Sequence, residues 1–72
     1  MDLQRQLNEA YATMAARRDA YQAAFANFRE RPDDSDLFRT TEEASFGLLN
    51  ALVDLNKAIF NLHYSCGGNH RP

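Results

Sequence analysis

The chain has little of what usually stabilises a domain of 72 residues. It contains one cysteine, Cys66, so no disulfide can form within it, and a reducing compartment is expected. A single hydrophobic core is marginal at this size, and small domains are commonly supported by disulfides, a metal or association. Since disulfides are excluded, association with another chain is the expected support.

Basic charge and long hydrophobic runs are also scarce. The net charge of −2 argues against nucleic-acid binding, which usually needs a clustered basic surface. No run approaches 18 apolar residues, so no segment is expected to span a membrane. The opening residues lack the basic, apolar and small-residue regions of a secretory signal. We therefore expect a cytoplasmic protein.

The first part of the chain has the composition of one long helix. Residues 2–31 contain no glycine or proline and are rich in alanine, the strongest helix former. Apolar residues recur every seven positions, which favours a gentle left-handed supercoil against a partner helix. The repeat consists of Leu7, Met14, Tyr21 and Phe28, with Leu3, Ala10, Arg17 and Ala24 at the companion position and Tyr11 and Phe25 widening the stripe.

Two arginines interrupt this stripe at its centre. The stems of Arg17 and Arg18 can pack while their guanidinium groups reach water. Alternatively, they form a salt bridge with a carboxylate of a partner.

A turn follows over residues 32–36. Pro32 ends the first helix, because proline removes a backbone donor and disfavours helical geometry in the residue before it. Two signals compete for the start of the second helix. Asp34 or Ser35 can cap an early start, whereas Thr40, with Glu43 three residues later, forms a capping box. We favour the early start, with an irregularity near Thr40.

The whole sequence is then one all-α domain over residues 1–72. It comprises a helix of about 2–31, the turn 32–36, a helix of about 36–66 and a flexible tail over 67–72. Gly67 and Gly68 are expected to stop the second helix after Ser65 or Cys66. Two helices of equal length and a short turn predict an antiparallel hairpin.

The second helix carries more apolar surface than one neighbour can cover. Between residues 37 and 64 the apolar arc spans roughly 200°, twice what one packing partner needs. We assign one seam to the contact within the hairpin: Leu48, Leu52, Leu55, Ile59 and Leu62. A second seam, which we assign to a partner chain that completes a helical bundle, consists of Phe46, Leu49, Val53 and Phe60.

Two details of this assignment stay open. One alternative is that a broad first helix covers both seams, but an exposed apolar strip otherwise favours aggregation, so a partner is the better interpretation. Asn56 lies between the seams, where it is either solvated at an edge or fixes the register of pairing.

The sequence shows no catalytic pattern. It lacks a Ser/His/Asp order, a Gly-rich phosphate loop and a clustered carboxylate pair, so we expect no enzyme, cofactor or small-molecule substrate. His63, Cys66 and His70 could begin a zinc site, but a fourth ligand is missing and we assign no metal. A histidine that complements the end of the helix is the simpler interpretation.

The two ends of the chain resemble a known family. Residues 3–8, Leu-Gln-Arg-Gln-Leu-Asn, and residues 58–64, Ala-Ile-Phe-Asn-Leu-His-Tyr, followed by Gly67, resemble the YscE/PscE-like co-chaperones of type III secretion. The resemblance implies a cytosolic helical hairpin that binds a larger TPR-like chaperone and, with it, keeps the needle subunit from polymerising. The turn at residues 32–36 departs from the family, whose connection is richer in glycine.

Two other functions fit a hairpin of this size. A phage-encoded inhibitor that binds a host regulatory protein would have similar length and acidity. A homodimeric four-helix bundle that binds RNA would need a basic stripe, whereas the arginines here alternate with acidic residues. A homodimer is also expected when the chain is alone.

Overall fold

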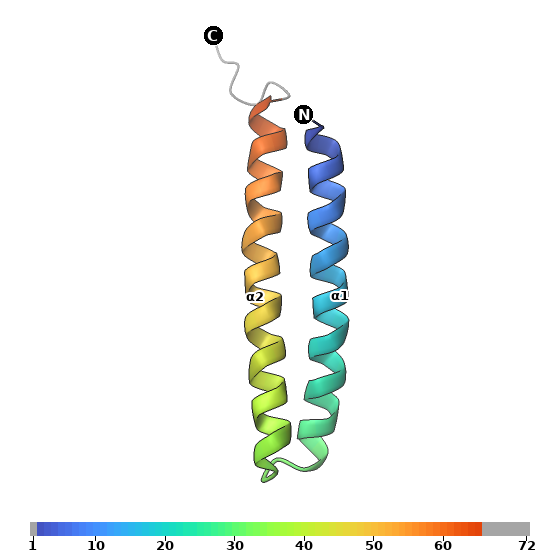
Figure 1. Ribbon diagram of the computed structural model, residues 1–72, viewed down its shortest axis with the longest axis vertical. Coiled ribbons are helices and arrows are strands. Elements are labelled where there is room, and N and C mark those ends of the chain that lie inside the picture. The colour runs from blue at the N-terminus through green and yellow to red at the C-terminus, as the bar shows by residue number, and fades with distance from the viewer. Residues whose placement is uncertain (1, 66–72) are drawn as a thin grey trace.

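The computed structural model describes residues 2–65, which form two antiparallel helices, α1 (Leu3–Glu30) and α2 (Ser35–His63) (Figure 1). The helices lie side by side along their length, and a short turn joins them at one end. No strand occurs among the described residues. The predicted all-α antiparallel hairpin is confirmed, and its completion by a partner chain stays a prediction.

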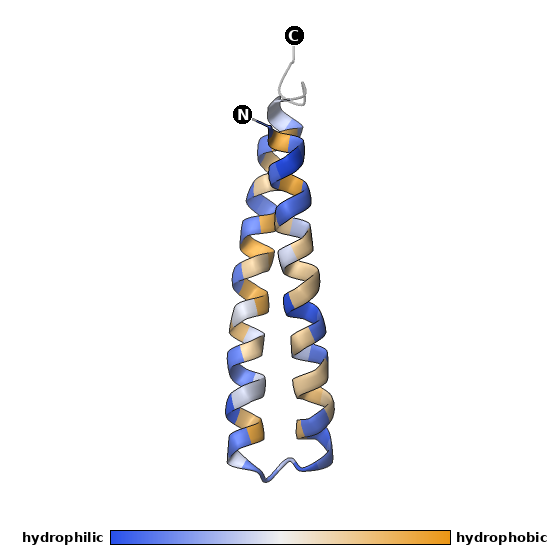
Figure 2. Cartoon of the chain, turned by 45° about the vertical axis from the view of Figure 1, so that its right-hand side comes forward, coloured by the Kyte–Doolittle hydropathy of each residue, from blue (hydrophilic) through white to orange (hydrophobic). Residues whose placement is uncertain are grey.

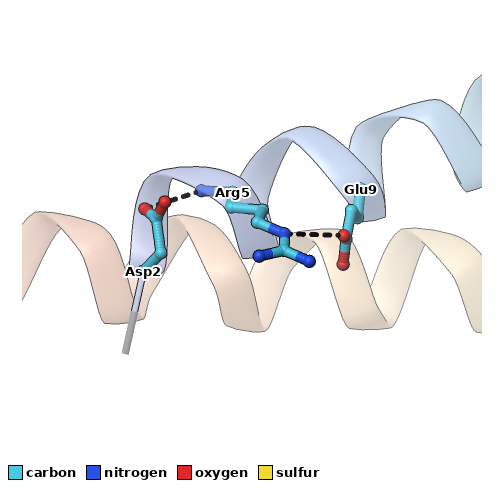
Figure 3. A network of polar contacts seen from close by, with 3 residues as sticks. All are labelled: Asp2, Arg5 and Glu9. Carbon is cyan, nitrogen blue, oxygen red and sulfur yellow. Dashed lines mark hydrogen bonds and ion pairs between the residues drawn. The ribbon is translucent and has the colours of Figure 1, made fainter.

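Both helices begin at an aspartate cap. The Asp2 carboxylate accepts a hydrogen bond from the backbone N–H of Arg5 at 3.1 Å, and the Arg5 side chain pairs with Glu9 at 3.3 Å (Figure 3). The Asp34 carboxylate accepts from two backbone N–H groups, those of residues 36 and 37, at 2.9 and 3.1 Å. Such bonds satisfy donors that a helix start leaves unpaired.

The structure decides between the two predicted starts of α2. Asp34 is the cap, as favoured from the sequence, and the helix continues through Thr40 without interruption. The capping box at Thr40 and the irregularity there were wrong. The reason is that Asp34 already satisfies the first two donors, so the helix is established before Thr40 is reached.

The C-terminal ends of the helices differ in detail. α1 ends at Glu30, where Arg31 precedes the proline and donates its N–H to the Phe28 carbonyl at 3.0 Å. The α-helical part of α2 ends at His63, and Tyr64 and Ser65 continue it as a π-helical turn. Cys66, the Gly67–Gly68 stop and the tail over 67–72 lie outside the described residues.

Contacts between the helices fix their register. The guanidinium Nη1 of Arg17 lies 3.2 Å from the Gly47 carbonyl oxygen, Thr41 Oγ1 lies 3.1 Å from the Ala24 carbonyl oxygen, and the rings of Phe28 and Phe38 lie 6.1 Å apart. Residue numbers that face each other across the hairpin therefore sum to about 65. In this register large residues face small ones: Leu7 faces Ala58, Met14 faces Ala51, Tyr21 faces Ala44, and Leu55 faces Ala10.

This alternation explains a wrong prediction about the contact within the hairpin. Leu52 and Ile59 were expected there but are 42% and 47% exposed, whereas Ala51 and Ala58 are buried. Large side chains at 51 and 58 would compete for space with the large residues of α1, because interiors are filled at near-crystal density. We define the inner seam of α2 by its partly or fully buried residues Leu48, Ala51, Leu55, Ala58 and Leu62.

The heptad stripe predicted for α1 faces this seam, apart from its central arginine. Its partly or fully buried members are Leu3, Leu7, Ala10, Met14, Tyr21, Ala24 and Phe28. Tyr11 and Phe25, expected to widen the stripe, are 54% and 40% exposed. α1 therefore has a narrow packing face, which one neighbour covers.

The hairpin has almost no enclosed core. Among residues 2–65 only three alanines, Ala24, Ala51 and Ala58, are buried hydrophobic residues, and no large side chain is fully enclosed. The radius of gyration is 16.6 Å, against about 11 Å for a compact chain of this length. Because a stable domain normally needs two packed layers, one pair of helices leaves the outer surface of α2 uncovered.

Candidate protein-binding surface

α2 carries a second apolar surface outside the hairpin contact. We call it the outer strip, and its residues are Phe46 (57% exposed), Leu49 (53%), Leu52 (42%), Val53 (54%), Ile59 (47%) and Phe60 (51%). A buried hydrophobic side chain is normally almost fully enclosed, whereas each of these leaves about half of its surface exposed to solvent. The hydrophobic positions recur along both helices rather than collecting at one end (Figure 2).

Helical geometry explains where the strip lies. Phe46, Val53 and Phe60 are seven residues apart and share one line on the side of α2 that faces away from α1. Leu52 and Ile59 share a second line, which borders the inner seam. The outer strip therefore runs from the edge of the hairpin contact around to the back of α2.

The middle of the strip is hollowed. A shallow depression there is lined by Leu49, Leu52, Val53, Leu55, Asn56 and Ile59. Leu55 belongs to the inner seam, so the depression reaches from the strip to the hairpin contact. Asn56 is exposed and is the polar member of this lining. It lies beside the residues of the outer strip and lines the depression, which leaves both interpretations of Asn56 open.

The four residues assigned to a partner from the sequence are all exposed and share this surface. Phe46, Leu49, Val53 and Phe60 lie on the side of α2 turned from α1, where a second chain has access to them. Leu52 and Ile59 extend the surface, although their spacing predicted that they lie in the hairpin contact. Ala51 and Ala58 have the same spacing of seven as the large residues of α1, which indicates the alternative contact but does not fix the register between the helices.

The two broad sides of the hairpin differ in polarity. The line of α1 that carries Tyr11 and Phe25 borders the same side as Leu52 and Ile59, because antiparallel helices bring corresponding flanks together. The opposite side is polar. A depression there is lined by Gln6, Glu9, Ala10, Thr13, Ala51 and Asp54.

Four arginines contact groups within the hairpin. Arg17 donates to the Gly47 carbonyl, so its guanidinium binds within the hairpin instead of only reaching water. Arg18 pairs with Asp19 at 3.5 Å, so both carboxylate and guanidinium come from α1. Arg5 and Arg39 likewise lie beside Glu9 and Asp36. Such alternation of charge leaves no long basic line through these positions.

Residues 2–65 show no preorganised polar site. No polar or charged residue among them is buried, and no three of their His, Cys, Asp or Glu side chains are grouped closely enough to hold a metal ion. His63 packs edge-on against Tyr64, with ring centroids 5.0 Å apart. Cys66 and His70 lie outside the described residues. Neither α1 nor α2 is long and apolar enough to cross a membrane.

The outer strip is therefore the surface of the described chain that most needs a functional explanation. Contiguous apolar patches of this kind on a folded protein commonly mark binding sites. Comparisons with the models of known protein families, with curated proteins and with solved structures find no match to the chain, so its function is inferred from this surface.

Proposed function

We propose that this chain is a small non-catalytic protein-binding module that completes a helical bundle with a partner chain. The observation that carries the proposal is the outer strip, whose six apolar side chains are each about half exposed on a helix that already packs against α1. The partner-binding residues are Phe46, Leu49, Val53 and Phe60, with Leu52 and Ile59 at the edge.

The sparse core supports the same proposal. A hairpin whose buried residues are three alanines gains little from its own packing, since hydrophobic stabilisation scales with the apolar area removed from water. A partner that covers the outer strip supplies the missing second layer. By mass action, the chain and its partner then stabilise each other.

Within this class we propose a cytoplasmic co-chaperone of type III secretion. The partner is a TPR-like chaperone whose helices form a groove, and α2 lies in that groove in the manner of an amphipathic helix. The pair then keeps the needle subunit from polymerising. This more specific role is supported by the resemblance of residues 3–8 and 58–64 to the family, together with the hairpin itself.

The test is affinity capture of the tagged full chain from its own host, with identification of the bound proteins by mass spectrometry. The variant Leu49→Asp places a charge in the outer strip, and Asn50→Asp places the same charge on the next residue, which is exposed outside the strip. We expect the chain and Asn50→Asp to recover a TPR-like chaperone and a needle subunit. Leu49→Asp should recover at least about tenfold less, since an interface anchor is worth 2 kcal/mol or more.

Two outcomes contradict the proposal. Recovery of a transcription factor or another regulatory protein in place of the chaperone would favour the inhibitor function. Equal recovery by the two variants would show that binding does not use the outer strip. Circular dichroism of each complex establishes that both variants keep their helices, and Phe60→Ala, which adds no charge, serves as a second strip variant.

A further inference from the structure

We propose that a second copy of this chain covers the outer strip when no partner is bound, with the two α2 helices packed antiparallel. The area of the strip supports this occupant. Each of its six side chains leaves roughly 100 Å² exposed, so the strip offers on the order of 600 Å² per copy. Complete coverage of both strips buries about 1,200 Å², the lower bound for stable specific interfaces.

The strip has the spacing of a helix–helix seam. Phe46, Val53 and Phe60 follow each other at intervals of seven, and Leu49 and Asn56 lie at the intermediate positions. In an antiparallel pair, facing residue numbers have a constant sum, and a sum of about 109 places the intermediate positions of one copy opposite the seven-residue positions of the other. Leu49 of one copy then faces Phe60 of the other, and Val53 faces Asn56, with Leu52 and Ile59 along the flank.

The distribution of charge selects the antiparallel direction. The turn and the first half of α2 are acidic, with Asp33, Asp34, Asp36, Glu42 and Glu43 and the single cation Arg39, whereas residues 49–63 carry one acidic residue and one lysine. A parallel pair would place the two acidic ends side by side. An antiparallel pair separates them and also aligns the helix dipoles favourably.

Asn56 then acquires a role in this pairing. With the register above, the two copies of Asn56 are offset by about 4.5 Å along the helix axis, at 1.5 Å per residue. Their amides lie close enough to hydrogen-bond across the centre of the interface. A polar residue in such a seam fixes register and direction while it lowers affinity.

Sedimentation equilibrium of the purified full chain tests the assembly. We expect a dimer that dissociates on dilution in the micromolar range. Leu49→Asp should weaken dimerisation at least about tenfold, and Asn50→Asp by less than about twofold. A monomer up to high micromolar concentration, a polydisperse aggregate, or equal effects of the two variants would overturn the proposal.

Disulfide cross-linking in a Cys66→Ser background tests the direction. A mixture of Leu49→Cys copies with Phe60→Cys copies should cross-link on oxidation, because these residues face each other. Leu49→Cys alone should not, since its two cysteines would be about 16 Å apart along the axis. Efficient cross-linking of Leu49→Cys alone would show a parallel pair and overturn the proposal. Asn56→Leu should tighten the dimer and allow both cross-links.

The inference goes beyond the proposed function, and the two can fail separately. Capture of a TPR-like chaperone by a chain that is monomeric when alone would refute self-association and leave the function standing. A dimer formed by a chain that captures no such chaperone would support self-association and contradict the proposed function. If both hold, a fluorescently labelled dimer should dissociate when purified partner is added, because both occupants need the same strip.

Discussion

The two apolar surfaces of α2 differ in side-chain size more than in hydrophobicity. The inner seam alternates leucine with alanine, and its alanines face the large residues of α1. The outer strip has no alanine, and its residues are all Phe, Leu, Ile or Val. Large side chains can interdigitate only where small ones make room for them. Hydrophobicity therefore indicates that a face will be buried, and side-chain volume indicates which neighbour can bury it.

The same comparison separates the two helices. α1 has one narrow packing stripe that matches the inner seam, with Tyr11 and Phe25 exposed on its flank. α2 has both the inner seam and the outer strip. In any larger bundle, α2 is thus the middle helix, and α1 lies at the outside with its polar side toward solvent.

Truncating one leucine on each surface to alanine should give the largest difference in the free energy of unfolding between the two surfaces. Leu55→Ala removes methyl groups from the inner seam and should lower the free energy of unfolding by about 2 kcal/mol, the low end for leucine because Leu55 is only half-buried. Leu52→Ala should cost less than about 1 kcal/mol. Urea unfolding followed by circular dichroism at several protein concentrations measures both.

Repeating the unfolding measurements at several protein concentrations provides the control for Leu55→Ala and Leu52→Ala. The effect of Leu55→Ala should stay constant on dilution, because the inner seam is intramolecular. The effect of Leu52→Ala should grow with concentration as a second copy covers the strip. Equal losses for the two variants at the lowest concentration would contradict the division of α2 into two surfaces.

A smaller effect tests the match of large and small residues directly. Ala51→Leu inserts a larger side chain opposite Met14 and should destabilise the hairpin by about 1 kcal/mol, the low end for overpacking because Met14 is only partly buried. Asn50→Leu adds a leucine at the neighbouring exposed position and should change stability by less than about 0.5 kcal/mol. Thermal unfolding of the two variants gives the comparison. If Ala51→Leu is the more stable of the two, the inner seam has spare volume and the proposed match is wrong.

Much of the fold could be predicted from local rules in the sequence. The cap at Asp34, the turn after Pro32 and the heptad stripe of α1 depend on residues close to each other in the chain. The exposure of Phe46 and Phe60 follows from helical geometry once the arc of α2 is too wide for one neighbour.

The position of Leu52 and Ile59 could not be obtained in the same way. The seven-residue spacing of Leu52 and Ile59 fits the hairpin contact as well as the spacing of Ala51 and Ala58 does. Each alanine directly precedes one of the two larger residues in the sequence. The choice depends on which residue of α1 lies opposite, and that depends on register between segments distant in the chain. The Arg17–Gly47 and Thr41–Ala24 contacts supply the register, and they were not visible as a sequence pattern.

The smallest effect concerns Gly47, where a cation rather than an apolar side chain of α1 meets α2. A glycine inside a helix is about 1 kcal/mol less favourable than alanine, but a Cβ at 47 would lie 3.1 Å from Nη1 and 3.6 Å from Cδ of Arg17. The guanidinium is the end of a flexible side chain, so it can move at the loss of its hydrogen bond to the Gly47 carbonyl. Gly47→Ala alone should therefore stabilise the hairpin by less than about 0.5 kcal/mol, and by about 1 kcal/mol in an Arg17→Ala background. Urea unfolding of the four proteins of this double-mutant cycle measures the difference. If Gly47→Ala has the same effect in both backgrounds, the Arg17 side chain and Gly47 are not coupled, and the hairpin does not depend on the Arg17–Gly47 hydrogen bond.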